Sequence, residues 1–142
     1  MTGLLIALLS GALMSVQGVF NTQVTRNSSV WVANIWVQLT ALLVCFAAWL
    51  VTERKSFAGI WTVEPKYMLT GGMIGAFITY TVIVSMDKLG PARAALFIVT
   101  AQLILAYLIE LTGIFGVGKQ TLTVRSVIGL AVTVAGVAIF KW

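Results

Sequence analysis

The sequence predicts an all-α membrane protein with five transmembrane helices, and its composition and hydrophobic pattern carry that prediction. Of the 142 residues, 60% are hydrophobic and only 9% are charged, whereas soluble domains carry about a quarter charged residues. Such a chain cannot cover a water-facing surface, so we expect it to be embedded in the lipid bilayer. Its apolar residues fall into runs of about 20 residues, the length of a spanning helix, rather than into the alternating strands of a barrel.

Polar or helix-breaking residues interrupt the apolar runs and set the expected helix ends. The breaks are Asn27 to Ser29, Thr52 to Lys66, Asp87 to Pro91 and Gly113 to Thr123. These segments hold glycine, proline, asparagine, serine or charged residues, which end helices or stay in water. The last span ends at Lys141 and Trp142. The expected helices cover about residues 3–24, 30–51, 67–86, 92–112 and 124–140.

The whole chain, residues 1–142, is expected to form a single five-helix transmembrane domain. Its longest connection, Thr52 to Lys66, is too short to bury a core of its own. The first span lacks a basic start and continues past the length of a signal-peptide core, so we interpret it as a retained helix.

The basic residues are divided almost evenly between the two sides of the membrane. One side holds the N-terminus and the connections after the second and fourth spans, and the other side holds the remaining connections and the C-terminus. The first side carries Arg54, Lys55, Lys66, Lys119 and Arg125. The second side carries Arg26, Lys88, Arg93 and Lys141. Because an excess of Lys and Arg on one side orients a membrane protein, this balance favours dual topology, with copies inserted both ways, over one weakly biased orientation.

Amide side chains lie inside the first apolar span, where lipid cannot solvate them. At 100° per residue, Ser10, Met14, Gln17 and Asn21 share one stripe of the helix. An unpaired amide costs several kcal/mol in an apolar medium, so these groups must meet one another, a wet cavity or a substrate. The alternative is interhelical hydrogen bonding, worth about 0.6 kcal/mol per contact. We expect the stripe to line a cavity and Ser10, Gln17 and Asn21 to bind a substrate.

Two further spans carry amides. Asn34 and Gln38 share a stripe of the second span and are further candidates for substrate binding. Gln102, on a small-residue face of the fourth span, is either a substrate ligand or an interhelical hydrogen-bonding group. Glu110 lies near the end of the same apolar run, where an ionisable residue indicates either a functional site or an interfacial position.

The residue types exclude other classes of function. The chain has no histidine and one cysteine, so we expect no metal site of the usual kind and no cofactor. No nucleophile and base occur in a catalytic arrangement, so we do not expect an enzyme. The net charge of +5 reports topology and lipid contact in a membrane chain, so we expect no nucleic-acid partner.

Three stretches resemble a known family: GALMSVQGVFNTQV in the first span, LTGGMIGAFITYTVIVSMDKLGPARA through the third and TAQLILAYLIELTGIFG in the fourth. They are similar to the YdcZ-like family of small bacterial inner-membrane proteins, within the drug/metabolite transporter superfamily. The most specific parts are Gln17 with Asn21, and Gln102 followed by Glu110 and Gly113. The family more often has aspartate where this chain has Glu110. The resemblance covers nearly the whole chain and implies a multi-pass protein of the bacterial inner membrane.

The resemblance also implies an assembly. Members of the family occur as single genes, as paired genes and as fused two-domain proteins. This implies an antiparallel dimer with a second copy or a sister protein, resembling the two inverted halves of a ten-helix drug/metabolite transporter. The related small multidrug resistance proteins carry a glutamate in mid-membrane in their first span. This chain offers Gln17 there, an amide that exchanges no proton, so the resemblance does not extend to drug/proton antiport.

These observations favour a membrane transporter of a small polar solute that works by alternating access in an antiparallel dimer. Amides from both copies would replace the water that the solute loses. One alternative is a small dual-topology ion channel whose pore the amides line. Another is a non-transporting partner that assembles with a different membrane protein.

Overall fold

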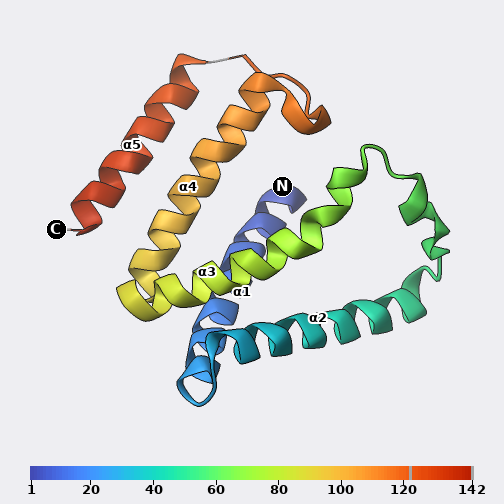
Figure 1. Ribbon diagram of the computed structural model, residues 1–142. Helices are drawn as coiled ribbons and strands as arrows, with labels where there is room; N and C mark the ends of the chain where they lie inside the picture. The colour runs from blue at the N-terminus through green and yellow to red at the C-terminus, as the bar shows by residue number, and fades with distance from the viewer. Residues whose placement is uncertain (122, 142) are drawn as a thin grey trace. The chain divides into compact units, whose positions relative to one another are not determined.

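The computed structural model describes residues 1–121 and 123–141, with the backbone alone at Lys141, and it contains helices and connections without a strand in this part of the chain (Figure 1). Trp142, at the expected end of the fifth span, lies outside the described residues. The α-helices are α1 (Thr2–Arg26), α2 (Val30–Thr52), α3 (Gly71–Leu89), α4 (Pro91–Thr112) and α5 (Val124–Lys141). Short 3-10 helices are η1 (Phe57–Thr62), η2 (Lys66–Thr70) and η3 (Ile114–Gly116). The prediction of an all-α fold is confirmed.

Four of the helical segments are long and apolar enough to cross a membrane. They are Thr2–Arg26, Val30–Thr52, Lys66–Leu89 and Pro91–Thr112, with 25, 23, 24 and 22 residues. The apolar part of α5, Val124–Phe140, is shorter, at the lower end of the length that spans a bilayer. A fifth apolar helix is therefore present, and its crossing of the membrane stays a prediction.

Local chemistry explains where the helices begin and end. The Ser29 hydroxyl caps α2 by accepting a hydrogen bond from the Val32 N–H at 3.2 Å. Pro91 occupies the first turn of α4, where its missing N–H costs nothing. Gly113 ends α4 with a φ of +69°, a left-handed conformation that glycine adopts without strain. The third span differs most from the expected range, because η2 precedes α3 and α3 continues to Leu89.

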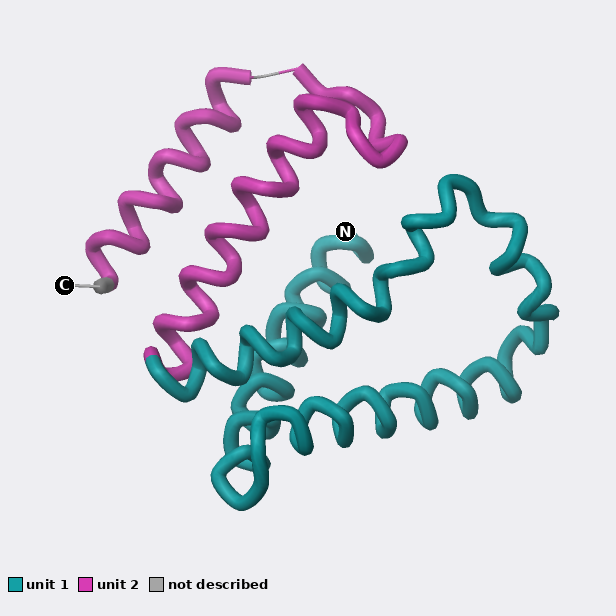
Figure 2. Tube along the Cα trace, viewed as in Figure 1, with its two compact units in different colours: residues 1–88 teal, residues 89–142 magenta. Residues whose placement is uncertain are grey.

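The chain divides into two compact units, Met1–Lys88 and Leu89–Trp142, which Figure 2 shows in separate colours. The first unit contains α1, α2 and α3, and the second contains α4 and α5. The organisation as a single domain stays a prediction.

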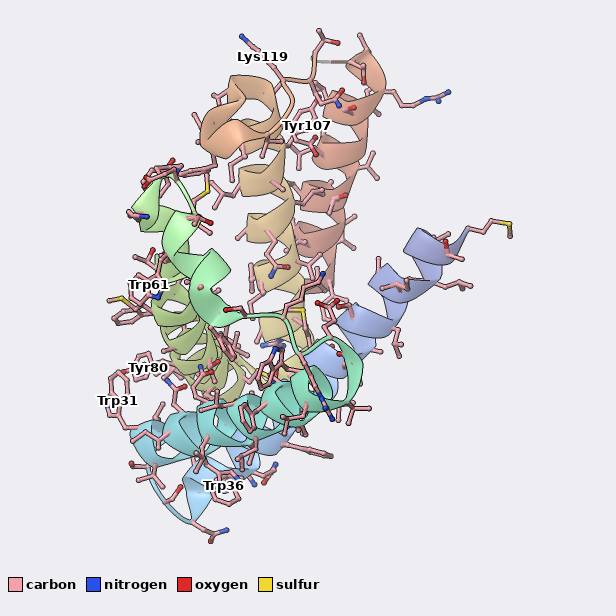
Figure 3. All side chains as sticks on the ribbon, turned by 90° about the vertical axis from the view of Figure 1, so that its right-hand side faces the viewer. Trp31, Trp36, Trp61, Tyr80, Tyr107 and Lys119 are labelled. Atoms are coloured by element: carbon pink, nitrogen blue, oxygen red, sulfur yellow. The ribbon has the colours of Figure 1, made fainter. Side chains whose placement is uncertain are left out.

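In the first unit, α1, α2 and α3 meet around a small buried cluster. Its members are Gly18, Asn21 and Thr22 of α1, Ala33 and Asn34 of α2, and Ile83 and Met86 of α3. The rings of Trp31 and Tyr80 stack beside this cluster with their centroids 4.8 Å apart, as Figure 3 shows. From there α2 and α3 diverge toward the connection that carries η1 and η2 (Figure 1).

The second unit is a helical hairpin of α4 and α5 (Figure 2). The connection after α4 folds back on the end of that helix. The Gly113 N–H donates to the Ile109 carbonyl and the Gln120 N–H donates to the Glu110 carbonyl, both at 2.9 Å. These bonds satisfy carbonyls that a helix end leaves without a partner, and they fix the connection beside Glu110.

Candidate functional site

A groove of about 760 Å³ runs between α1 and α2, and we call it the α1–α2 groove. Its α1 wall consists of Ser10, Leu13, Met14, Val16, Gln17, Phe20, Asn21 and Val24. Its α2 wall consists of Trp36, Val37, Thr40, Ala41, Val44 and Cys45. The volume lies within the range of about 300–1,000 Å³ typical of small-molecule sites.

The amide stripe of α1 lines this groove. Ser10, Gln17 and Asn21 all belong to the same wall, because residues at this spacing lie on one face of a helix. Asn21 is only 7% exposed, and neither it nor Gln17 donates or accepts a side-chain hydrogen bond among the described residues. Their amide groups therefore remain available to a ligand, to water or to another chain.

The α2 wall contributes residues that the sequence analysis did not select. Trp36 presents an exposed ring, and Figure 3 shows it on α2. The Thr40 hydroxyl donates to the Trp36 and Val37 carbonyls at 2.9 and 3.0 Å, so its oxygen remains an acceptor on the groove. Trp36, Thr40 and Val44 are spaced so that they share one face of a helix. This spacing does not predict which neighbouring helix that face meets.

The other predicted residues of α2 lie elsewhere. Asn34 is 3% exposed and its Nδ2 donates to the Ala76 carbonyl of α3 at 2.8 Å. Gln38 is exposed and does not line the groove. The groove uses a face of α2 that is rotated by roughly 80° from the amide stripe, at 100° per residue. Ala41 and Cys45 belong to the amide stripe and lie at the edge of the groove wall. Asn34 and Gln38 belong to the same stripe but do not line the groove.

The two remaining candidates belong to the second unit. Gln102 is exposed on α4 and lines no pocket described there. Glu110 lines a separate pocket between α4 and α5. The structure thus brings Ser10, Gln17 and Asn21 together in one groove, and it places Gln102 and Glu110 in a unit of their own.

The charged residues leave the α1–α2 groove without a formal charge on its walls. No described Asp, Glu, Lys or Arg side chain lines it. Two ion pairs lie in the connection between α2 and α3, Lys55 with Glu53 at 3.4 Å and Lys66 with Glu64 at 3.0 Å. Within the described part of the chain, no three His, Cys, Asp or Glu side chains come close enough to hold a metal ion. The groove can therefore offer hydrogen bonds and aromatic contact.

Apolar helices of membrane-spanning length, with an amide-lined groove between two of them, define a multi-pass membrane protein. A family model described as "Putative inner membrane exporter, YdcZ" matches residues 2–139, and the chain belongs to that family. The resemblance found in the sequence is thereby confirmed, as is a location in the inner membrane. The family description names an exporter, which is a kind of transporter. No curated protein matches the chain, and no solved structure does.

Proposed function

We propose that this protein exports a small, uncharged, polar solute across the inner membrane and that the α1–α2 groove forms part of its binding site. The observation that carries the proposal is the position of Gln17 and Asn21. Both amides line the groove, and neither has a hydrogen-bond partner among the described residues. In a membrane an unpaired amide costs several kcal/mol, so these groups need a partner that the described residues do not supply.

The walls of the groove indicate the chemistry of the solute. Amides donate and accept hydrogen bonds, and the Ser10 and Thr40 oxygens add acceptors. Trp36 and Phe20 provide an apolar surface on which a ring or a carbon skeleton can rest. A charged solute would lose its hydration without meeting an opposite charge on these walls, and this loss is expensive. The groove therefore favours a neutral solute with several hydrogen-bonding groups.

A second copy in antiparallel arrangement completes the proposed site. The groove is open in a single chain, and Gln17 and Gln38 are exposed on helices that lie in lipid. A second copy can cover the groove and supply its own amides. Two copies that exchange their conformations would give alternating access. The near balance of basic residues on the two sides supports an antiparallel pair.

The substitution Gln17→Leu tests the proposal, with Gln23→Leu as its matched control. Gln23 is also an exposed amide of α1, but it does not line the groove. A panel of uncharged, hydrogen-bonding metabolites is first screened for compounds that raise the unfolding temperature of the purified protein. We expect Gln17→Leu to abolish the effect of such a compound and its uptake into liposomes, because Leu resembles Gln in size and lacks its polar atoms. Gln23→Leu should retain both.

Different outcomes separate the competing functions. If Gln17 only joins helices, Gln17→Leu should weaken assembly by about 1 kcal/mol or less while surviving dimers still bind. Saturable uptake with counterflow would support a carrier. Rapid flux without counterflow would indicate a channel, and inert liposomes together with a co-purifying membrane protein would indicate an assembly partner. A Gln17→Leu protein that transports normally would contradict the assignment of the groove.

A further inference from the structure

A second polar pocket lies within the hairpin of α4 and α5, and we call it the α4–α5 pocket. Its volume is about 420 Å³. It is lined by Leu103, Tyr107, Glu110, Ser126, Gly129, Leu130 and Thr133. The α4 members follow one another at intervals of four and three residues, so they form one face of the helix. Figure 3 shows Tyr107 between the ribbons of the two helices.

Tyr107 carries a buried hydroxyl group that has no partner among the described residues. Its phenol oxygen is shielded from solvent and makes no hydrogen bond among the described residues. Leaving such a group unsatisfied costs about 1–3 kcal/mol. A group bound in the pocket could remove that cost.

Glu110 is an exposed carboxylate that has no cationic partner among the described residues. It lies in the last turn of α4 and forms no ion pair with a described residue. The C-terminal end of a helix is the negative end of its dipole, where a carboxylate is unfavourable. Lys119 and Arg125 are at the same end of the hairpin, but neither lines the pocket, and Figure 3 shows the Lys119 side chain extending away from Tyr107.

Two hydroxyl groups of α5, those of Ser126 and Thr133, face the pocket. The Thr133 hydroxyl donates its hydrogen to the Gly129 carbonyl at 2.9 Å, which leaves its oxygen lone pairs free. The Ser126 and Thr123 hydroxyl oxygens are 2.6 Å apart and share one hydrogen bond. The Glu110 carboxylate would repel an anion, whereas oxygen atoms around one carboxylate suit a hard cation.

The pocket also has room for an ion. A Cβ atom added at Gly129 would meet nothing within 4 Å, so this part of the α5 wall is open. Binding of a proton would require only the Glu110 carboxylate and no further ligand. The additional oxygens and the vacant volume fit a larger cation.

We propose that the α4–α5 pocket binds one alkali-metal cation, sodium or potassium, with Glu110 as its charge partner and Tyr107 as a neutral oxygen ligand. The cation is the counter-charge of the Glu110 carboxylate in this site. The lack of histidine and the single cysteine led us to expect no metal site of the usual kind. A site made only of oxygen ligands is compatible with that expectation. Cation binding does not depend on the proposed export, but a role of the cation in driving export rests on that function.

The test measures the unfolding temperature of the purified protein as sodium or potassium chloride replaces choline chloride at constant ionic strength. We expect a saturable rise for at least one of the two metal ions, because a ligand of the folded state stabilises it. The ion that gives the larger rise identifies the cation. The rise should disappear in Glu110→Gln and persist in Glu64→Gln, whose carboxylate pairs with Lys66 in the connection before α3.

Two further variants test the geometry without removing the charge. Tyr107→Phe should weaken the apparent affinity by about two- to tenfold, the range expected for one neutral interaction. Gly129→Val should abolish the rise, because its side chain occupies the open part of the pocket. If Glu110→Gln does not fold, equilibrium binding of radioactive sodium to the unmodified protein, with choline as competitor, decides the question.

Three results would overturn the proposal. They are stabilisation by acid alone with none by sodium or potassium, a cation effect that Glu110→Gln retains, and no specific binding of radioactive sodium or potassium to the unmodified protein. The measurement requires no solute, so its failure is distinct from a failure of the Gln17→Leu assay.

Discussion

Asn34 illustrates how one residue type can serve different purposes in neighbouring helices. Its Nδ2 donates to the Ala76 carbonyl, and its Oδ1 is buried without a hydrogen-bond partner among the described residues. The hydrogen bond contributes about 0.6 kcal/mol in a membrane, and the unsatisfied oxygen costs a comparable or larger amount. Asn34 thus joins α2 to α3 with little net contribution to the free energy of unfolding. Gln17 and Asn21 instead line the groove.

We predict that Asn34→Leu changes the free energy of unfolding by less than about 1 kcal/mol, because it removes the hydrogen bond and the unsatisfied oxygen together. Asn34→Asp should destabilise the protein by several kcal/mol, because it buries a carboxylate beside the Ala76 carbonyl. Denaturation in detergent measures both changes. If Asn34→Leu has normal stability but no longer transports, Asn34 binds the solute, as expected from the sequence.

The approach of α1 to α3 depends on one glycine. A Cβ atom at Gly18 would lie 2.5 Å from both Sδ and Cε of Met86 and 3.4 Å from Cγ1 of Val82. Small residues permit this close approach between membrane helices, where dispersion contacts replace the hydrophobic effect. Because α1 also forms one wall of the groove, its contact with α3 holds that wall in place.

We expect Gly18→Ala to cost about 1 kcal/mol or less, because the end of the Met86 side chain is flexible and can shift. Gly18→Leu should cost about 1–3 kcal/mol, since the larger side chain overfills the contact. Met86→Ala in the Gly18→Leu background should recover part of that loss. The unfolding temperatures of the two single variants and the double variant measure the coupling. Simple additivity of their effects would show that Gly18 and Met86 are not in contact.

The whole chain exposes most of each span. In each of the four long spans, no more than 6% of the most apolar 18-residue stretch is buried. Lipid or a second copy must cover the rest. The basic residues that orient the chain lie outside these stretches or at helix ends and are divided five to four. Lys55 and Lys66 form ion pairs with Glu53 and Glu64, but acidic residues contribute little to membrane orientation.

We predict that reporters fused to the C-terminus give signal on both sides of the membrane, because neither orientation has a marked excess of Lys and Arg. Adding two or three lysines to the connection between α2 and α3 should shift the population toward the orientation that keeps this connection in the cytoplasm. A reporter signal on one side only would rule out dual topology.

The class of protein and the approximate positions of its helices follow from the sequence alone. Runs of about 20 apolar residues can form only spanning helices in lipid, because every backbone polar group must find a partner within the segment. Helix caps such as Ser29, Pro91 and Gly113 are local signals too. Helical periodicity likewise placed Ser10, Gln17 and Asn21 on one face of α1.

The neighbour that each face meets depended on the three-dimensional packing. Every face of a membrane helix is apolar enough for lipid, so periodicity does not show which face of α2 lies against α1 and which against α3. For that reason the sequence grouped Asn34 and Gln38 with the α1 amides, whereas Trp36 and Thr40 line the groove. The same holds for Glu110, since Tyr107 and Thr133 join it only when α4 and α5 pack together.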